Sequence, residues 1–258
     1  MNTWRAGWLF PVAALLFVAA VAGPIVAVLA GVTPGEAVAA FSAPAARSAL
    51  DTSLRASLSA TLVATILGVP AGYYMARCAP PVRAALIFTL ALPLALPPVA
   101  SGIILLSVAG ARAPLGAWLA AHGIAIPDSQ TGVAIAEFFV SGSFVAIAAT
   151  AAFSALDPIY EDAARTLGAG EMRIFARVAL PAAAANIAIG VAFAWLRAIG
   201  EYGATSVLAY HPTSLPVALY VALSASGVQA ALALAYGFIV LAAAVLFVQW
   251  VLQRRVVG

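Results

Sequence analysis

Residues 157–181 read DPIYEDAARTLGAGEMRIFARVALP, a segment we call the polar island. The island carries seven of the chain's 21 charged residues (12 basic and 9 acidic), whereas the sequence on both sides of it is almost entirely apolar. A short charged segment between two apolar stretches is where a membrane protein can meet a soluble partner. The island therefore predicts a helical membrane protein with a functional loop outside the bilayer.

The composition excludes a soluble domain. Of the 258 residues, 65% are hydrophobic and only 8% are charged, and the mean hydropathy is +1.08, whereas soluble domains carry about 25% charged residues. The net charge of +3 comes from 12 arginines and no lysine, which indicates a topology bias rather than nucleic-acid binding. One cysteine (Cys78) and two distant histidines (His122 and His211) form no disulfide or metal-ligand pattern. The sequence predicts no metal site, no catalytic residue and no cofactor.

A membrane helix needs about 20 mostly apolar residues. Six stretches meet this requirement and predict an all-α, polytopic membrane protein with a single transmembrane domain over 1–258: residues 8–31, 54–76, 84–109, 132–155, 178–199 and 229–252. The first stretch could also be a signal peptide, with Arg5 before it and a small-residue cleavage site at 20–23. Its apolar run continues to Val32, however, which is too long for the core of a signal peptide.

Six spans place both termini on the same side of the membrane, and arginine placement indicates which side. With the termini inside, the inner segments hold eight arginines: Arg5, Arg77, Arg83, Arg165, Arg173, Arg177, Arg254 and Arg255. The outer segments hold four: Arg47, Arg55, Arg112 and Arg197. This distribution predicts that both termini and the loop 156–177 are cytoplasmic.

Two segments interrupt the regular pattern of spans. The third span contains LPLALPPVASG at 92–102, in which three prolines remove backbone donors and predict a kink. Irregular backbone in a bilayer must face either protein or a cavity. This segment is therefore either a kink that packs against other helices or a wall of a transport route. The candidate residues for the route are Pro93, Pro97, Pro98, Ser101 and Gly102. Residues 200–228 are too polar and too rich in proline to span, and they predict outer loops with one short helix.

The polar island predicts two short helices of its own. Asp157 and Pro158 are typical of a helix start, and Gly168 of a helix end. Arg165 follows Glu161 by four residues, so that the two side chains can pair on one helix face, beside a short apolar stripe of Ile159, Ala163, Thr166 and Leu167. A second short helix is expected to lead into the fifth span. From the residues alone, the first helix either docks a partner or lies on the membrane surface as an interfacial helix.

The island also resembles a known signature. Residues 161–168, EDAARTLG, followed by LP at 180–181, resemble the EAA motif of permeases of type I ABC importers, onto which the ATPase subunit docks. Asp162 departs from the motif because it stands where many permeases keep the glutamate. The resemblance assigns coupling to the ATPase to Glu161, Asp162, Ala163, Ala164, Arg165, Gly168, Leu180 and Pro181. The proline-rich segment at 92–102, and RAIGEYGAT at 197–205, further resemble the molybdate, tungstate and sulfate branch.

The resemblance implies the transmembrane subunit of an ATP-driven importer in the cell inner membrane. It implies two copies of the chain, two ATPase subunits, an extracytoplasmic substrate-binding protein, and transport of a small oxyanion by alternating access. The chain has no G-x-x-x-x-G-K-[ST] motif and no lysine, so ATP hydrolysis must come from a partner. Permeases for iron, thiamine, phosphonate or polyamines carry similar loops and stay open as alternatives. A secondary carrier and a membrane enzyme are further alternatives, but both usually need several ionisable residues inside the spans, where Glu137 is the only acid.

Arg197 and Glu201 form the last pair of candidates. They are four residues apart near the outer end of the fifth span and would face one another in a continuous helix. Arg197 could contact an anion directly, or the pair could fix the outer gate, with Glu137 as a second partner for the arginine.

Overall fold

The computed structural model describes the backbone of residues 8–257 and the side chains of residues 8–251. Within these residues every regular element is a helix. Five helical segments are long and apolar enough to cross a membrane, and a bent pair of helices supplies a sixth candidate. The five segments are α1 (Leu9–Gly31), α3 (Pro44–Arg77), α7 (Gln130–Ser154), the segment Glu171–Ile199 that ends in α10 (Leu180–Ile199), and α13 (Val228–Val257). The prediction of an all-α polytopic fold with about six spans is confirmed.

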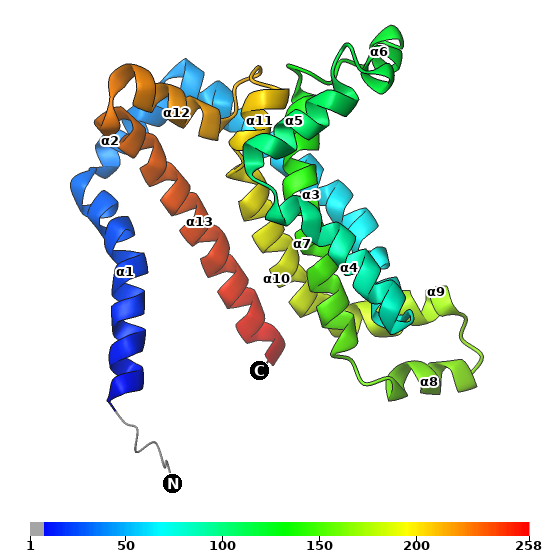
Figure 1. The fold of residues 1–258 in the computed structure, drawn as a ribbon. Coiled ribbons are helices and arrows are strands. Elements are labelled where there is room, and N and C mark those ends of the chain that lie inside the picture. The colour runs from blue at the N-terminus through cyan, green and yellow to red at the C-terminus, as the bar shows by residue number, and fades with distance from the viewer. Residues whose placement is uncertain (1–7, 258) are drawn as a thin grey trace.

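Short helices gather at the two ends of the spans (Figure 1). The upper end in this view holds α2 (Pro34–Ser42), α5 (Pro98–Ala109), α6 (Pro114–Ala121), α11 (Gly203–Leu208) and α12 (Leu215–Ser226). The lower end holds α8 (Ile159–Thr166) and α9 (Glu171–Ile174), which belong to the polar island. We call the lower end the island end and the upper end the opposite end.

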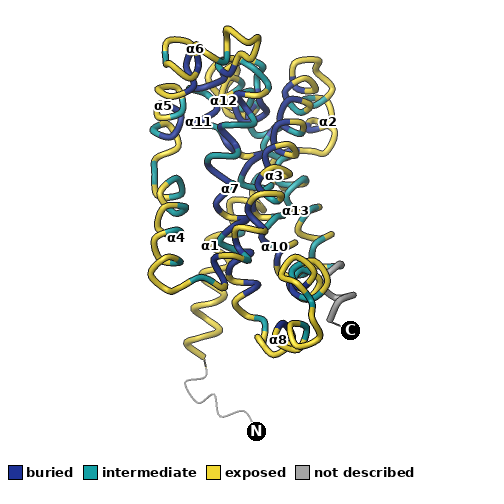
Figure 2. Tube along the Cα trace, turned by 90° about the vertical axis from the view of Figure 1, so that its right-hand side faces the viewer, coloured by how far each residue is buried: buried dark blue, intermediate teal, exposed yellow. Residues whose placement is uncertain are grey.

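The core lies where α3, α7 and α10 pack together, and small residues allow the close approach. A Cβ atom added to Gly72 of α3 would lie 2.5 Å from the Cβ of Ala149 and 2.9 Å from the backbone N of Thr150 in α7. Figure 2 shows that buried residues concentrate on this central group, whereas α1 has no buried residue. In lipid, where apolar surface alone does not drive helices together, such close backbone contact stabilises the bundle.

The third span is predicted as a single kinked helix over residues 84–109, and this prediction is wrong in one respect. It is broken into α4 (Pro80–Ala95) and α5, which are bent by 108° relative to one another. Two successive prolines cause the break: Leu96 and Pro97, each followed by a proline, take extended backbone with ψ of 142° and 134°. Pro93, in contrast, lies within α4 and does not end it.

Three further boundaries differ from the predictions. The second span begins at Pro44, ten residues before the predicted start at 54, because α3 continues beyond the apolar stretch. Residues 200–228 contain two helices, α11 and α12, rather than one. The second helix of the island is not separate, since α9 continues through a π-helical turn (Phe175–Ala179) directly into α10.

The ends of the described chain lie at the island end. α1 begins there and α13 ends there, so the prediction that the first and last spans share a side is confirmed for the described residues (Figure 1). Arg5, and the side chains of Arg254 and Arg255, lie outside the described residues. The described arginines divide as expected, with Arg77, Arg83, Arg165, Arg173 and Arg177 toward the island end and Arg47, Arg55, Arg112 and Arg197 toward the opposite end.

Candidate functional site

The first part of the polar island folds into α8, and capping hydrogen bonds define both ends of this helix. The Asp157 carboxylate accepts a hydrogen bond of 3.0 Å from the backbone N–H of Ile159, so Asp157 caps the helix while Pro158 occupies the formal cap position. At the other end, the N–H of Gly168 donates to the carbonyl of Arg165 (2.9 Å) and the N–H of Ala169 donates to the carbonyl of Ala164 (3.0 Å). This is the Schellman arrangement, and Gly168 has the positive φ of +79° that it requires. The predicted start and end of this helix are confirmed to within one residue.

Helix α8 turns its apolar residues away from the rest of the chain. Leu167 is 89% exposed, and Ile159 and Tyr160 are exposed as well, as is Met172 of the neighbouring α9. Ala163 and Thr166, the other members of the predicted apolar stripe, are also exposed. The stripe therefore forms an outward surface rather than a contact within the chain.

Glu161 faces the opposite way and is only 2% exposed. Its carboxylate is bound by Arg77, the last residue of α3, through an ion pair from Nη2 to Oε1 and a hydrogen bond of 3.1 Å from Nε to Oε2. These hydrogen bonds hold the pKa of the Glu161 carboxyl below its ordinary value. The predicted partner Arg165 also reaches Glu161, at 3.4 Å, but this is the longer contact.

Arg165 instead organises the island itself. Its Nη1 donates to Asp162 at 2.9 Å, and its Nε donates to Glu171 at 2.9 Å. The hydrogen bonds to Glu171 and Asp162 raise the pKa of the guanidinium further above its usual value. This arginine therefore links α8 to the start of α9.

The remaining island residues lie close to this arrangement. Leu180 packs against the α3–α7–α10 core, and Pro181 stands in the first turn of α10. Pro181 also lines a cavity of about 370 Å³ beneath α8, together with Leu156, Asp157, Tyr160, Glu161 and Arg177. The structure thus brings together the residues to which the resemblance assigns coupling, and it places Arg77, which sequence reasoning missed, beside them; their coupling role stays a prediction.

A second group of predicted residues lies at the opposite end. Arg197 donates a hydrogen bond of 2.5 Å to Glu201, which confirms the predicted pair. The helix is not continuous, however, because α10 ends at Ile199 and Glu201 precedes α11, where it accepts a second bond from the N–H of Ala204 (2.8 Å). Glu137 is fully buried, and among the described residues neither of its carboxylate oxygens has a hydrogen-bond partner. The expected second pairing of Arg197 with Glu137 is therefore wrong for this conformation.

The proline-rich segment forms a close contact between α5 and α11. Ser101 is fully buried, and a Cβ atom added to Gly102 would lie 2.7 Å from the Cβ of Val207 in α11. A Cβ atom added to Gly203 would lie 2.5 Å from the Cβ of Pro98. This geometry explains why small residues occur here, while the idea that the segment borders a transport route stays a prediction.

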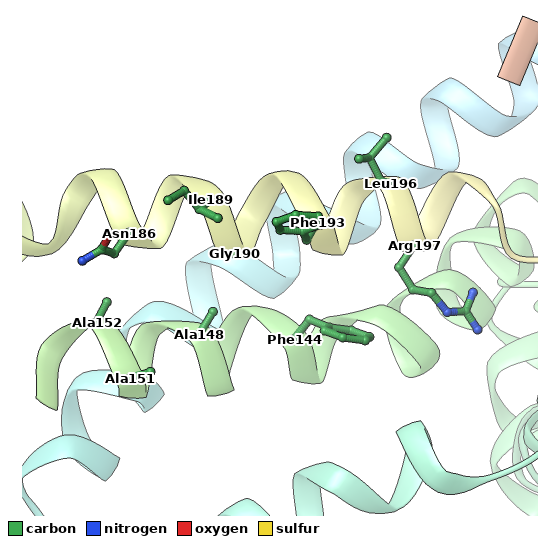
Figure 3. A pocket seen from close by; sticks show the side chains of 10 residues that line it. All are labelled: Phe144, Ala148, Ala151, Ala152, Asn186, Ile189, Gly190, Phe193, Leu196 and Arg197. Atoms are coloured by element: carbon green, nitrogen blue, oxygen red, sulfur yellow. The ribbon is translucent and has the colours of Figure 1, made fainter. Parts of the chain in front are cut away.

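A groove between α7 and α10 carries no signature that the sequence could reveal. It has a volume of about 820 Å³ and is lined on the α7 side by Phe144, Ala148, Ala151 and Ala152. Figure 3 shows the α10 residues Asn186, Ile189, Gly190, Phe193, Leu196 and Arg197 on its other side. Within the described residues, Arg197 is the only charged residue of this lining.

The family described as "Binding-protein-dependent transport system inner membrane component" matches residues 68–258. The chain belongs to this family. It is therefore an integral, multi-pass protein of the inner membrane and the membrane component of a transport system rather than its ATPase. The prediction of an ABC transporter permease is confirmed.

Curated relatives of this permease are named as permeases for molybdenum, for sulfate and for molybdate/tungstate. A probable molybdenum ABC transporter permease of Haloferax volcanii is 39% identical over 64% of this chain and 60% of its own length. The sulfate permease CysW of Synechocystis is 38% identical over 55% of this chain and 52% of its own length. The molybdate/tungstate permease WtpB of Thermococcus kodakarensis is 32% identical over 74% and 72%. The match thus spans about half to three quarters of these relatives.

Two solved structures share the fold of the permease. The crystal structure of a bacterial alginate ABC transporter in complex with a pentasaccharide-bound periplasmic protein matches with a TM-score of 0.74, at 16% identity, over 98% of this chain and 95% of the other. An inward-facing structure of the MetNI methionine ABC transporter matches with a TM-score of 0.63, at 16% identity, over 81% and 94%. At these identities the likeness concerns the fold alone.

Proposed function

We propose that this permease is the transmembrane subunit of an ATP-driven importer that carries a small oxyanion (molybdate, tungstate or sulfate) by alternating access. One observation carries the proposal: α8 is a self-capped helix outside the spans that is bound to the bundle by Glu161 and presents apolar residues outward. Such a helix can transmit movement from a soluble partner to the membrane bundle. In this mechanism the ATPase dimer closes on ATP, α8 moves with it, and the spans open the route outward.

The surface of α8 suits a protein partner. Ile159, Tyr160 and Leu167 are exposed apolar residues, and the charged side chains of Asp162 and Glu171 are exposed around them. Apolar residues, aromatic ones among them, within a polar rim are typical of a protein interface. A helix that lies on a membrane surface is usually rich in lysine and arginine, whereas α8 carries two acids and a single arginine. We therefore favour docking of an ATPase subunit over the interfacial helix.

The proposed substrate class rests on the relatives' names. The named relatives concern molybdenum, molybdate/tungstate and sulfate. An anion route favours positive potential, and Arg197 is the one charged residue among the described residues that line the groove between α7 and α10. Glu201 pairs with this arginine and offsets most of its charge. We propose that the pair fixes the outer gate, so that discrimination among the anions lies mainly with the binding protein.

The rest of the assembly follows the resemblance. We propose that two copies of the chain stand side by side, with ATPase subunits at the island end and a substrate-binding protein at the opposite end. The island end then faces the cytoplasm together with both termini, in agreement with the arginine distribution. The exposed apolar face of α1, which has no buried residue, leaves room for a second copy or for lipid.

An uptake assay tests the proposal. The chain, its ATPase and its binding protein are reconstituted in vesicles, and accumulation of molybdate, tungstate and sulfate is measured with and without ATP. We expect ATP-dependent accumulation of at least one of these dianions and competition among them. Accumulation of thiamine, iron, a phosphonate or a polyamine instead would contradict the oxyanion assignment, and accumulation without ATP would contradict the importer mechanism.

A further inference from the structure

Arg77 makes a connection that the chain path alone does not provide. Helix α8 is joined to α7 and to α9 by short turns, but the Arg77–Glu161 pair joins it directly to the end of α3, 84 residues away in sequence. The guanidinium occupies both carboxylate oxygens of Glu161, a paired geometry that fixes distance and orientation together. The Glu161 side chain is 3% exposed, so water does not replace this partner in the structure.

The same arginine also holds the end of α7. Its Nη1 donates a hydrogen bond of 3.1 Å to the backbone carbonyl of Phe153. Its guanidinium lies 5.3 Å from the ring centre of Tyr73, whose hydroxyl donates to Glu161 at 3.3 Å. The Tyr73 ring in turn packs against Phe153 and Phe175 with ring centres 5.2 and 5.1 Å apart. The Arg77 guanidinium therefore contacts residues of α3, α7 and α8 at once, and it lies over the ring of Tyr73, which packs against two further aromatic rings.

A second arginine on α3 shows that this arrangement is unusual for the helix. Arg55 pairs with Asp51 on the same helix, but the two side chains are 72% and 57% exposed. Exposed pairs of this kind contribute little, because water and salt screen them. In the Arg77–Glu161 pair the side chains are 28% and 3% exposed, so removal of Arg77 leaves the buried Glu161 carboxylate without its main partner, which is unfavourable. Of these two pairs on α3, the Arg77 pair joins different helices, whereas the Arg55 pair stays within α3.

We propose that Arg77 is the positioning residue through which movement of α8 enters the centre of the membrane bundle. The proposal rests on the proposed coupling role of α8 and deepens it. Because Arg77 joins α8 to the ends of α3 and α7, these three segments move as one body when the ATPase moves α8. Since α3 and α7 form the core with α10, the movement reaches the core directly and not only along the chain through α9.

The test compares transport with ATP hydrolysis in assembled complexes. The Arg77→Gln variant keeps a polar side chain that can donate a hydrogen bond, but this side chain is shorter and lacks the charge and the paired geometry. We expect the ATPase to remain bound and to hydrolyse ATP, while the ATP consumed per substrate transported rises roughly 5-fold or more, the factor that corresponds to a loss of about 1 kcal/mol of coupling free energy. Arg77→Lys keeps the positive charge but lacks the planar guanidinium that binds both carboxylate oxygens, and it should give an intermediate ratio of ATP consumed to substrate transported. Arg55→Gln is the matched control and should leave the ratio unchanged.

A covalent tie provides a second measurement that does not depend on the stability of Arg77→Gln. Cysteines replace Arg77 and Glu161 in a Cys78→Ser background, and a short bis-methanethiosulfonate reagent joins them through two disulfides, which a thiol reductant can cleave. The uncoupled double variant should regain coupling when joined and lose it again on reduction. A normal ATP-to-substrate ratio in assembled Arg77→Gln, or no recovery in the joined complex, would overturn the proposal. Absence of transport in the wild-type complex would instead contradict the proposed function.

Discussion

A serine in place of Gly168 is expected to weaken the island in a way that Gly170→Ser does not. Gly168 has a φ of +79°, whereas Gly170 has a φ of −74°. A Cβ atom added at either position meets no atom within 4 Å, so neither variant causes a steric clash. Only the backbone conformation distinguishes them. An L-residue in the left-handed region costs about 1–2 kcal/mol, and this corresponds to a roughly 5- to 30-fold loss of the capped conformation.

The consequence is measured on the complex with the ATPase. Loss of the cap at Gly168 frees the carbonyls of Arg165 and Ala164, which the Schellman arrangement binds. We expect Gly168→Ser to lower the apparent affinity for the ATPase and the transport rate by roughly 5- to 30-fold, with insertion into the membrane unchanged. Gly168→Asn should retain more activity, because asparagine adopts this region more readily, and Gly170→Ser should behave as wild type. Equal effects of serine at the two positions would refute the reasoning.

Three further predictions follow from the same geometry. For topology, a cysteine that replaces Tyr160 should react with a membrane-impermeant thiol reagent only from the cytoplasm, and a cysteine that replaces His122 should react only from outside. The reverse result would contradict the proposed orientation. For the outer pair, Arg197→Ala and Glu201→Ala should each impair transport while the double variant recovers part of the loss; a transport-dead Arg197→Ala in a stable complex that Glu201→Ala does not rescue would indicate direct anion contact. For pH, the pKa of Glu161 is lowered in the folded protein, so its contribution to stability is complete above the ordinary glutamate pKa of about 4.3 and is lost only as the pH falls through the lowered value. Glu161→Gln should therefore weaken coupling, measured as substrate transported per ATP, equally at pH 6 and pH 8. A defect that occurs at only one of these pH values would be inconsistent with this reasoning.

Local patterns in the sequence were sufficient to predict the features that depend on neighbouring residues. The spans follow from the length of apolar stretches, the end of α8 follows from Gly168, and the Arg197–Glu201 pair follows from a spacing of four residues. Each of these depends on contacts within one or two helical turns. For that reason they hold even where the details differ, as at Glu201, which lies beyond the end of α10.

Features that depend on distant parts of the chain could not be predicted. Arg77 and Glu161 are separated by 84 residues, and the sequence offered Arg165 as a nearer partner. The prolines at 97 and 98 showed where the third span is interrupted, but not that the two halves turn by 108°. The groove between α7 and α10 is lined mainly by alanine, glycine and aromatic residues that look like ordinary span residues until two helices are placed side by side.

The most direct test of the account is whether the ATPase covers α8. A single cysteine replaces Leu167, which is 89% exposed, in a Cys78→Ser background. A control cysteine replaces Ile124, which is 46% exposed at the opposite end of the molecule. Labelling by a water-soluble thiol reagent is then measured in lipid nanodiscs with and without the ATPase. We predict that the ATPase protects the cysteine at position 167 and leaves the one at position 124 reactive; equal labelling at position 167 in both samples would contradict docking at α8.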